Sequence, residues 1–252
     1  MITPADIQRI KDLLPTSLGS DELRSSTASD ILRRSVFSAR MESARYLAKI
    51  REVAAQIVDG TVNQARAREL LLEELSRMGH APSDGGGLAN PASIRRLNLI
   101  VDTQRQMAAS ASSMMNETAG TLAAFPAYEL VRFVGKRVPR PDWDLRWSAA
   151  GDSVGWEGAL RGRFMALKDS PIWQAIGDGA GGFRDTLGNP FPPFAFSSGM
   201  AWREVSSDEA RSAGLEIPDG MRPNRPDLSP GERDIADAAE RLGFADMFAD
   251  LL

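Results

Sequence analysis

The chain has 252 residues, of which 42% are hydrophobic and 25% are charged, and its formal net charge at pH 7 is −4. This length and composition predict one large domain or two smaller ones, and they exclude a chain that is disordered throughout. The negative charge argues against a protein that coats nucleic acid, and the lack of cysteine excludes disulfides, thiolate metal sites and cysteine nucleophiles.

The N-terminal residues show no basic segment followed by an apolar one, as a secretory signal would. No apolar run approaches the roughly 18 residues that a membrane-spanning helix needs. We therefore expect neither a cleaved signal nor a membrane segment.

The first part of the chain predicts a pair of long helices. Hydrophobic residues recur at three- and four-residue steps over residues 21–58, and Gly60 is placed to end that helix. Asn63 is a favourable N-cap for a second helix, which Gly79 would end. The two are expected to form a helical hairpin.

A third helix is expected after a glycine-rich connection over residues 80–90. Asn90 followed by Pro91 is typical of an N-cap and the first helical position. The helical pattern then continues to a break near Gly120.

The character of the sequence changes after Phe125 and Pro126, because all five tryptophans lie beyond this point. We place domain boundaries to give a helical region of assembly helices over 1–124, an α+β body over 125–216, and an extended arm with a terminal helix over 217–252. The predicted fold class is α+β and predominantly α, with long N-terminal helices, a smaller α+β body containing a proline-aromatic loop, and a C-terminal helix.

Within the predicted body, the apolar residues Trp143, Leu145 and Trp147 alternate with Asp142, Asp144 and Arg146 at a period of two, which favours a half-buried strand. A short helix is expected after Ser170 and Pro171. Ser206 with Glu209 forms a capping-box pattern for another.

Residues 185–202 hold three prolines and three phenylalanines, too many prolines for a helix or an inner strand and too many rings for a linker. We expect tertiary packing to hold this loop. Its candidate packing or docking residues are Pro192, Pro193, Phe194, Phe196 and Trp202.

Two short patterns could indicate nucleotide or metal chemistry. Gly177–Gly182 matches G-x-G-x-x-G, but it follows a predicted helix rather than a strand, which favours an ordinary loop. Asp142 and Asp144 have the spacing of a metal-nucleotide site, although on a strand they would form a solvated edge beside Arg146. His80 is the only histidine. We therefore predict no catalytic residue, no metal site and no cofactor.

Basic residues gather among aromatic ones between 132 and 147, a combination that could contact DNA or a protein partner. A solvated strand edge with its rings packed inward is the favoured alternative, given the acidic chain. The candidate contact residues are Arg132, Lys136, Arg137, Arg140 and Arg146.

The order of several segments resembles the phage Mu-like minor head, or head morphogenesis, proteins over roughly residues 25–215. The matching segments are Arg34–Arg40, Ile100–Gln104, Arg137–Trp143 with Arg146–Trp147, Asp185–Gly188, and Pro192–Met200. The last segment is the most specific. Many of these relatives have a cysteine- and histidine-bearing cluster after the Pro-Pro pair, where this chain has Phe194 and Phe196, so it resembles a divergent branch without that cluster.

The resemblance implies a non-enzymatic structural component of a tailed-phage or prophage head, acting in head morphogenesis, DNA packaging or ejection. It implies association with the portal protein and other head proteins, possible contact with packaged DNA, and a location in the virion head or, during assembly, in the host cytoplasm. The alternatives are a Mg-dependent nucleotide or phosphate-ester enzyme, which would use Asp142, Asp144 and Gly177–Gly182, and a cytosolic helical adaptor.

Overall fold

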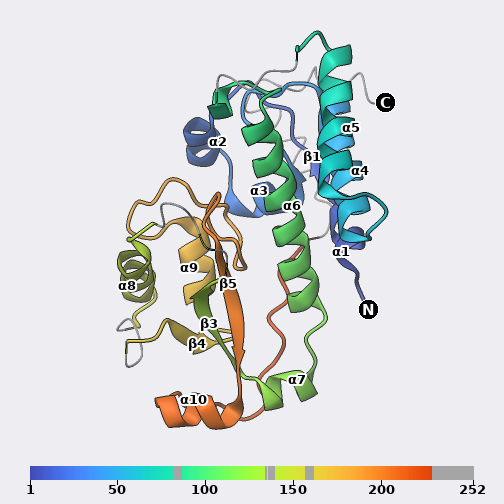
Figure 1. The fold of residues 1–252 in the computed structure, drawn as a ribbon. Helices are drawn as coiled ribbons and strands as arrows, with labels where there is room; N and C mark the ends of the chain where they lie inside the picture. Colours follow the sequence, from blue (N-terminus) through green and yellow to red (C-terminus); the bar gives the residue numbers. More distant parts are fainter. Residues whose placement is uncertain (82–86, 134, 136–139, 157–161, 229–252) are drawn as a thin grey trace. The chain divides into compact units, whose positions relative to one another are not determined.

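The computed structural model describes residues 1–81, 87–133, 135, 140–156 and 162–228 (Figure 1). The contacts divide the chain into two compact units. The helical unit comprises Ile2–Ala109 with Asp227 and Leu228, and the α+β unit comprises Ser110–Pro226 with Met1. The division therefore falls within a helix, between Ala109 and Ser110, and the domain bounds given above stay a prediction.

The helical unit is built mainly from α4 and α5, which are joined by a short turn and pack on each other. Two short strands, β1 and β2, pair in parallel beside them. The elements are α1 (Pro4–Arg9), β1 (Asp12–Leu13), α2 (Ser20–Ser26), α3 (Ser29–Arg34), β2 (Ser35–Val36), α4 (Ala44–Val58), α5 (Gln64–Arg77), the 3-10 turn η1 (Gly87–Ala89) and the first part of α6 (Ile94–Met115).

The hydrophobic stripes of the helices form the core of this unit. The buried residues of this core come from β1, β2, α4, α5 and the start of α6, together with Met41 before α4 and Ala92 before α6. Its large members include Tyr46, Leu47, Ile50, Leu71, Leu75, Leu97 and Val101.

The single helix predicted over residues 21–58 is wrong in its first half. The backbone is extended at Thr27 and Ser35, which end α2 and α3, and Arg40 has a left-handed φ of 57°. Serine and threonine hydroxyls compete with the helical hydrogen bonds, as where the Ser35 Oγ donates to the Ile31 carbonyl at 2.7 Å. A continuous helix is restored only at α4, which Ser43 caps.

The second predicted helix is confirmed as α5, because the Asn63 side chain accepts a hydrogen bond from the Arg66 N–H and Gly79 follows the last turn with a φ of 86°. The third is confirmed as α6, but it begins later than predicted. The Ser93 hydroxyl caps it by accepting from the Arg96 N–H, while Asn90 stabilises the preceding turn.

The α+β unit contains a three-stranded antiparallel sheet in the order β4–β3–β5, with Tyr128 opposite both Ala166 and Glu204. Helices α8 and α9 pack against each other. The elements after α6 are α7 (Ala119–Ala124), β3 (Ala127–Arg132), α8 (Trp143–Ser153), β4 (Met165–Leu167), α9 (Ile172–Asp178), β5 (Met200–Val205) and α10 (Ser207–Ala213). The α+β fold class is confirmed, and the predicted C-terminal helix lies outside the described residues.

The strand predicted around Trp143 is wrong, since these residues begin helix α8. Trp147 is 0% exposed and Trp143 is buried, whereas Leu145 between them is 63% exposed. Residues four apart share one face of a helix, so two tryptophans at this spacing fit a helix as well as a strand. Five residues are too few to distinguish the two periods.

Aromatic rings fill the core of the α+β unit. The Tyr128 and Trp202 rings are stacked with centroids 4.0 Å apart, and the Trp173 ring lies 5.4 Å from Trp147 and 6.1 Å from Phe194. Rings of this size bury a large apolar area each and dominate the stability of such a core.

Across the described part of the chain, the structure has no helix that combines the length and the apolar character needed to cross a membrane.

Candidate functional site

The side chains of the proline-aromatic loop face the core of their own unit. Phe194 is fully buried, as are Pro192 and Pro193, while Phe196 and Trp202 are half-buried. The rings that could have formed an exposed docking surface are therefore largely occupied by packing. Packing is the role that the geometry favours for this loop.

The backbone of the loop folds back on itself. The Leu187 N–H donates to the Phe194 carbonyl at 2.8 Å, and the Ser198 hydroxyl donates to the Pro193 carbonyl at 2.6 Å. Phe194 has a left-handed φ of 47°, which costs energy in a residue other than glycine and is sustained here by the surrounding contacts. The loop is held by its own hydrogen bonds as well as by its rings.

Four charged side chains connect this loop to α8; we call them the arginine–aspartate cluster, Arg140, Asp142, Arg146 and Asp185. The buried Arg146 donates from Nε to the Asp142 carboxylate at 3.0 Å and from Nη1 to the Asp185 carboxylate at 2.8 Å. Arg140 also forms an ion pair with Asp185 and donates to the Phe196 carbonyl at 2.6 Å. Asp185 at the start of the loop and Phe196 in its second half are thereby attached to α8 and to the segment before it.

Aromatic rings complete the surroundings of Arg146. Its guanidinium carbon lies 4.2 Å from the Phe183 ring centroid and 5.2 Å from that of Trp143. A buried cation needs such partners, because desolvation would otherwise be costly. Burial opposes ionisation of Asp185, but the hydrogen bond from Arg146 and the charges of both arginines hold the pKa of Asp185 below its usual value.

The candidate DNA-contacting arginines are brought together in part. Arg140 and Arg146 are engaged with carboxylates, whereas Arg132 donates to the carbonyls of Arg140 at 3.0 Å and Ser198 at 3.4 Å. Lys136 and Arg137 lie outside the described residues. Among the candidates that the structure describes, Arg132 is exposed, and the ring of Phe133 beside it is exposed as well.

The glycine-rich pattern lies at the end of α9 and not after a strand. A side chain on Gly177 would overlap the Asn189 backbone, and one on Gly179 would overlap the Phe183 carbonyl. The Gly188 N–H donates to the Gly177 carbonyl at 2.9 Å. These glycines permit close packing between α9 and the loop, a different use from cradling a phosphate.

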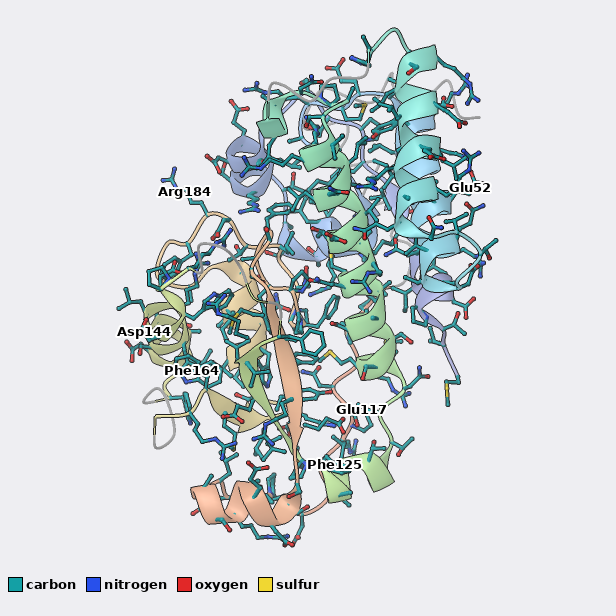
Figure 2. All side chains as sticks on the ribbon, in the orientation of Figure 1. Glu52, Glu117, Phe125, Asp144, Phe164 and Arg184 are labelled. Carbon is teal, nitrogen blue, oxygen red and sulfur yellow. The ribbon has the colours of Figure 1, made fainter. Side chains whose placement is uncertain are left out.

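The two aspartates of the metal-site hypothesis diverge. Asp142 is bound to Arg146, and Asp144 is exposed on α8, where Figure 2 shows it on the outer side of the helix. No group of three or more potential metal-ligating side chains gathers in the ranges that the structure describes.

Sequence analysis missed a buried ionic group, the Glu117 cluster, formed by Glu117, Thr121, Tyr128, Lys168 and Glu204. The Glu117 carboxylate accepts from Lys168 at 2.5 Å, from the Tyr128 hydroxyl at 2.9 Å and from Thr121 at 2.7 Å. Lys168 is 3% exposed and also binds Glu204 at 3.0 Å. Since Glu117 and Lys168 are 51 residues apart, no local pattern could have paired them.

The environment of this cluster favours ionised Glu117 and neutral Tyr128. Burial raises the pKa of Tyr128, and the charge of Glu117 and its hydrogen bond add to the effect. Burial opposes ionisation of Glu117, yet the hydrogen bonds from Lys168, Thr121 and Tyr128 lower its pKa. The group is internally satisfied, which is typical of a structural role.

A second ionic group lies where α10 meets the sheet, formed by Glu129, Arg163, Arg203 and Glu209. Arg163 donates to Glu129 at 2.6 Å and to Glu209 at 2.7 Å, and Arg203 bonds to both carboxylates as well. Hydrogen bonds from Arg203 and Arg163 lower the pKa of Glu209 to about 2. This group attaches α10 to β3 and β5.

Comparisons of the chain with protein-family models, with curated proteins and with solved structures found no match.

Proposed function

We propose that this chain is a non-enzymatic structural component of a tailed-phage or prophage head, a portal-associated minor head protein that acts in head morphogenesis, DNA packaging or ejection. The proposal begins from the order of segments that resembles the Mu-like minor head proteins. The portal protein and other head proteins are its proposed partners, with packaged DNA as a further possible contact.

One observation supports the proposal most directly. The described residues of two resembling segments, Arg137–Trp143 and Arg146–Trp147, meet the segments Asp185–Gly188 and Pro192–Met200 at the arginine–aspartate cluster. Residues about 40 positions apart in sequence thus share one set of ion pairs and one aromatic core. The resembling segments thus serve packing within the α+β unit, a use that fits a structural protein.

Two of the features that the enzyme alternative would use are engaged otherwise. Asp142 is paired with Arg146, and the close approach to Gly177 is taken by the Asn189 backbone. Titration of the protein with Mg²⁺ and nucleotides by calorimetry tests this alternative. Saturable binding that disappears in Asp142→Asn would support an enzyme and count against a purely structural role.

The structural proposal is tested on particles. Mass spectrometry of purified virions and procapsids should detect the chain, and electron microscopy should place its density near the portal vertex. The absence of the chain from both kinds of particle would overturn the proposal. Portal and terminase genes beside its gene would argue against the cytosolic adaptor, and their absence would favour it.

A further inference from the structure

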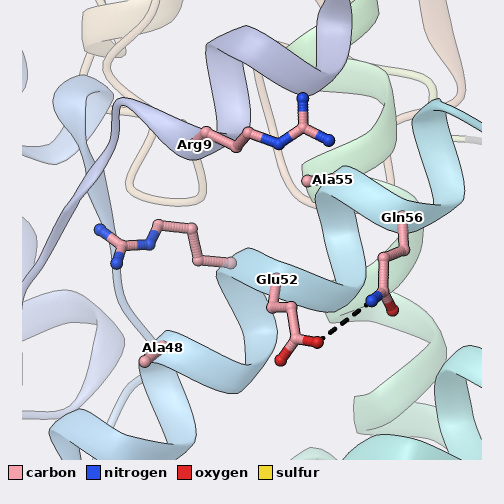
Figure 3. A pocket seen from close by; sticks show the side chains of 6 residues that line it. Arg9, Ala48, Glu52, Ala55 and Gln56 are labelled. Carbon is pink, nitrogen blue, oxygen red and sulfur yellow. Dashed lines mark hydrogen bonds between the residues drawn. The ribbon is translucent and has the colours of Figure 1, made fainter.

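In the helical unit, the polar side chains that line the hollow between α1 and α4 already make hydrogen bonds within the chain (Figure 3). The Gln56 amide donates to Glu52 at 3.1 Å, and Arg51 donates to the Lys11 carbonyl at 2.8 Å. The Lys11 ammonium group, itself buried, donates to the Gln104 amide oxygen at 3.2 Å. A row of unused hydrogen-bonding groups lies instead in the α+β unit, on the backbone of the sheet.

Strand β5 forms one edge of the three-stranded sheet (Figure 1). The Phe133 N–H donates to the Gly199 carbonyl at 2.9 Å, so the residues that bond to β3 are every second one from Gly199 to Val205. The residues between them point their backbone groups away from β3. They are Met200, Trp202 and Glu204.

Most of these outward groups have no partner within the chain. The N–H groups of Trp202 and Glu204 and the carbonyls of Met200 and Trp202 make no hydrogen bond to any residue that the structure describes. The other two are used, because the Met200 N–H donates to the Ser198 hydroxyl at 3.2 Å and the Glu204 carbonyl accepts from Arg203 Nη1 at 3.5 Å. Unpaired groups in a row along a strand are a template for a further strand.

The opposite edge of the sheet offers no comparable row. β4 has only three residues, and the Leu167 carbonyl accepts from the Trp173 indole N–H at 2.8 Å. The Met165 N–H donates to the Arg163 carbonyl at 3.0 Å. The β5 edge is therefore the one that suits an added strand.

The unused groups of β5 match those of a second, antiparallel copy of β5. With a two-fold axis at Trp202, this residue faces Trp202 of the second copy, and Glu204 faces Met200 of the second copy. The two Trp202 residues then exchange both of their hydrogen bonds, and each Glu204 N–H donates to a Met200 carbonyl. The only facing groups left without a mutual bond are the Met200 N–H and the Glu204 carbonyl. These two are the groups already used within their own chain.

The neighbouring registers fit less well. An axis at Arg203 would place two arginines directly opposite each other, which is repulsive. An axis at Ala201 would require the Met200 N–H, which Ser198 already occupies. The axis at Trp202 also brings two half-buried tryptophan rings together across the strands, a favourable cross-strand pair.

From this complementarity we infer that β5 is a homodimer interface, in which two copies of the chain pair β5 with β5 in antiparallel fashion about an axis at Trp202. The pairing joins two three-stranded sheets into one sheet in the order β4–β3–β5–β5–β3–β4. The partner is a second copy because its edge supplies an acceptor for each unused donor and a donor for each unused acceptor. The interface goes beyond the proposed function and does not depend on it.

Sedimentation of the full chain over a range of concentrations tests whether the dimer forms. A reversible monomer–dimer equilibrium is expected. A chain that stays monomeric up to about 1 mM, the weak limit of specific association, would overturn the inference.

Amide hydrogen exchange followed by nuclear magnetic resonance tests where the dimer forms. The Trp202 and Glu204 amides should exchange rapidly in dilute monomer and become protected as the dimer forms. The Arg203 amide, which bonds to β3, should be protected at every concentration and serves as the internal control. Dimerisation without new protection at Trp202 and Glu204 would place the interface elsewhere and refute the assignment.

A pair of charge variants tests the register, because Ala201 would face Arg203 of the second copy. Ala201→Glu should tighten the dimer and Ala201→Lys should weaken it, each by about threefold or more, since the contact occurs twice. Net charge alone predicts the reverse order, because the chain already carries −4.

The matched control pair is Ala65→Glu and Ala65→Lys, at an exposed position on α5, where only the net charge changes. Dissociation constants for all four variants come from sedimentation. The reverse order at Ala201, or a difference no larger than that at Ala65, would contradict the pairing. Should the Ala201 variants not fold, the exchange measurement on the wild type still decides.

Discussion

Lys11 is a charged residue whose burial has a measurable consequence. Removal from water lowers its pKa from 10.5 to about 8. The folded state therefore binds the proton less tightly than the unfolded state does, so the unfolding free energy is lowest below about pH 8 and rises as the pH increases toward 10.5.

We accordingly predict that Lys11→Met stabilises the protein at neutral pH, by about 1–3 kcal/mol, because it removes a buried cation that has only an amide partner. The variant should also lack the wild-type rise in stability at alkaline pH. Urea denaturation of both proteins at neutral and alkaline pH measures the two effects. A rise of equal size in the variant would show that another group causes it.

Phe194 is the residue of the proline-aromatic loop whose replacement should cost most. Phe194→Ala removes a fully buried ring and should lower the unfolding free energy by about 3–5 kcal/mol. Phe133→Ala is the matched control, since that ring is 79% exposed and its loss should change stability by less than about 0.5 kcal/mol. Chemical denaturation of both variants measures the two losses of unfolding free energy. Similar losses would argue against the core role of Phe194.

At the scale of elements, the Glu117 cluster joins the segment between α6 and α7 to all three strands of the sheet, through Tyr128 on β3, Lys168 just after β4 and Glu204 on β5. The Arg225 guanidinium also donates to the Glu117 carbonyl at 3.2 Å, so the extended segment after α10 is attached at the same point. Breaking this cluster should loosen several connections at once.

We predict that Glu117→Gln destabilises the protein by about 3–5 kcal/mol, because it leaves Lys168 buried and short of charge compensation. Combining it with Lys168→Met should recover part of that loss, since both charges are then absent. A thermodynamic double-mutant cycle measures the coupling. Strictly additive effects would show that the two side chains do not act as a pair.

The second ionic group, which attaches α10 through Glu209, should make the unfolding free energy depend on pH in the acid range. Because the folded-state pKa of Glu209 is lowered to about 2 from an ordinary value of 4.5, its contribution is present above pH 4.5 and is lost as the pH falls toward 2. Glu209→Gln should reduce the dependence of the melting temperature on pH in this window. High salt should reduce it as well, since these side chains are partly exposed. An unchanged acid profile in the variant would contradict the assignment.

At the scale of the whole molecule, the two units have separate hydrophobic cores. The core of the helical unit includes Leu71 and Leu75, and the aromatic core of the α+β unit includes Trp147 and Phe194, with no residue common to both among those described. A cavity made in one core removes packing contacts from the residues of that core first.

We predict that Phe194→Ala accelerates amide hydrogen exchange in β3 and β5 while α4 and α5 keep their protection. Leu71→Ala should instead accelerate exchange in α4 and α5 while β3 and β5 keep their protection. Exchange followed by mass spectrometry measures both. Uniform loss of protection in either variant would show that the two units unfold as one cooperative body.

Local patterns in the sequence determined several elements correctly. Asn63 and Gly79 marked the ends of α5 because capping depends on a side chain and a backbone conformation within a few residues. The proline content of residues 185–202 excluded regular structure for a similarly local reason, the fixed φ and missing N–H of proline. The α+β class followed from such local patterns taken in order.

Tertiary structure alone decided which distant residues meet. The partners of Asp185 are 39 and 45 residues away, and those of Glu117 and Arg51 come from other elements. It also decided that Trp143 and Trp147 lie on a helix, because the core of the unit buries both tryptophans and leaves Leu145, which had favoured a strand, exposed. Ion pairs between distant residues arise from long-range packing, and a sequence pattern of short range does not contain that information.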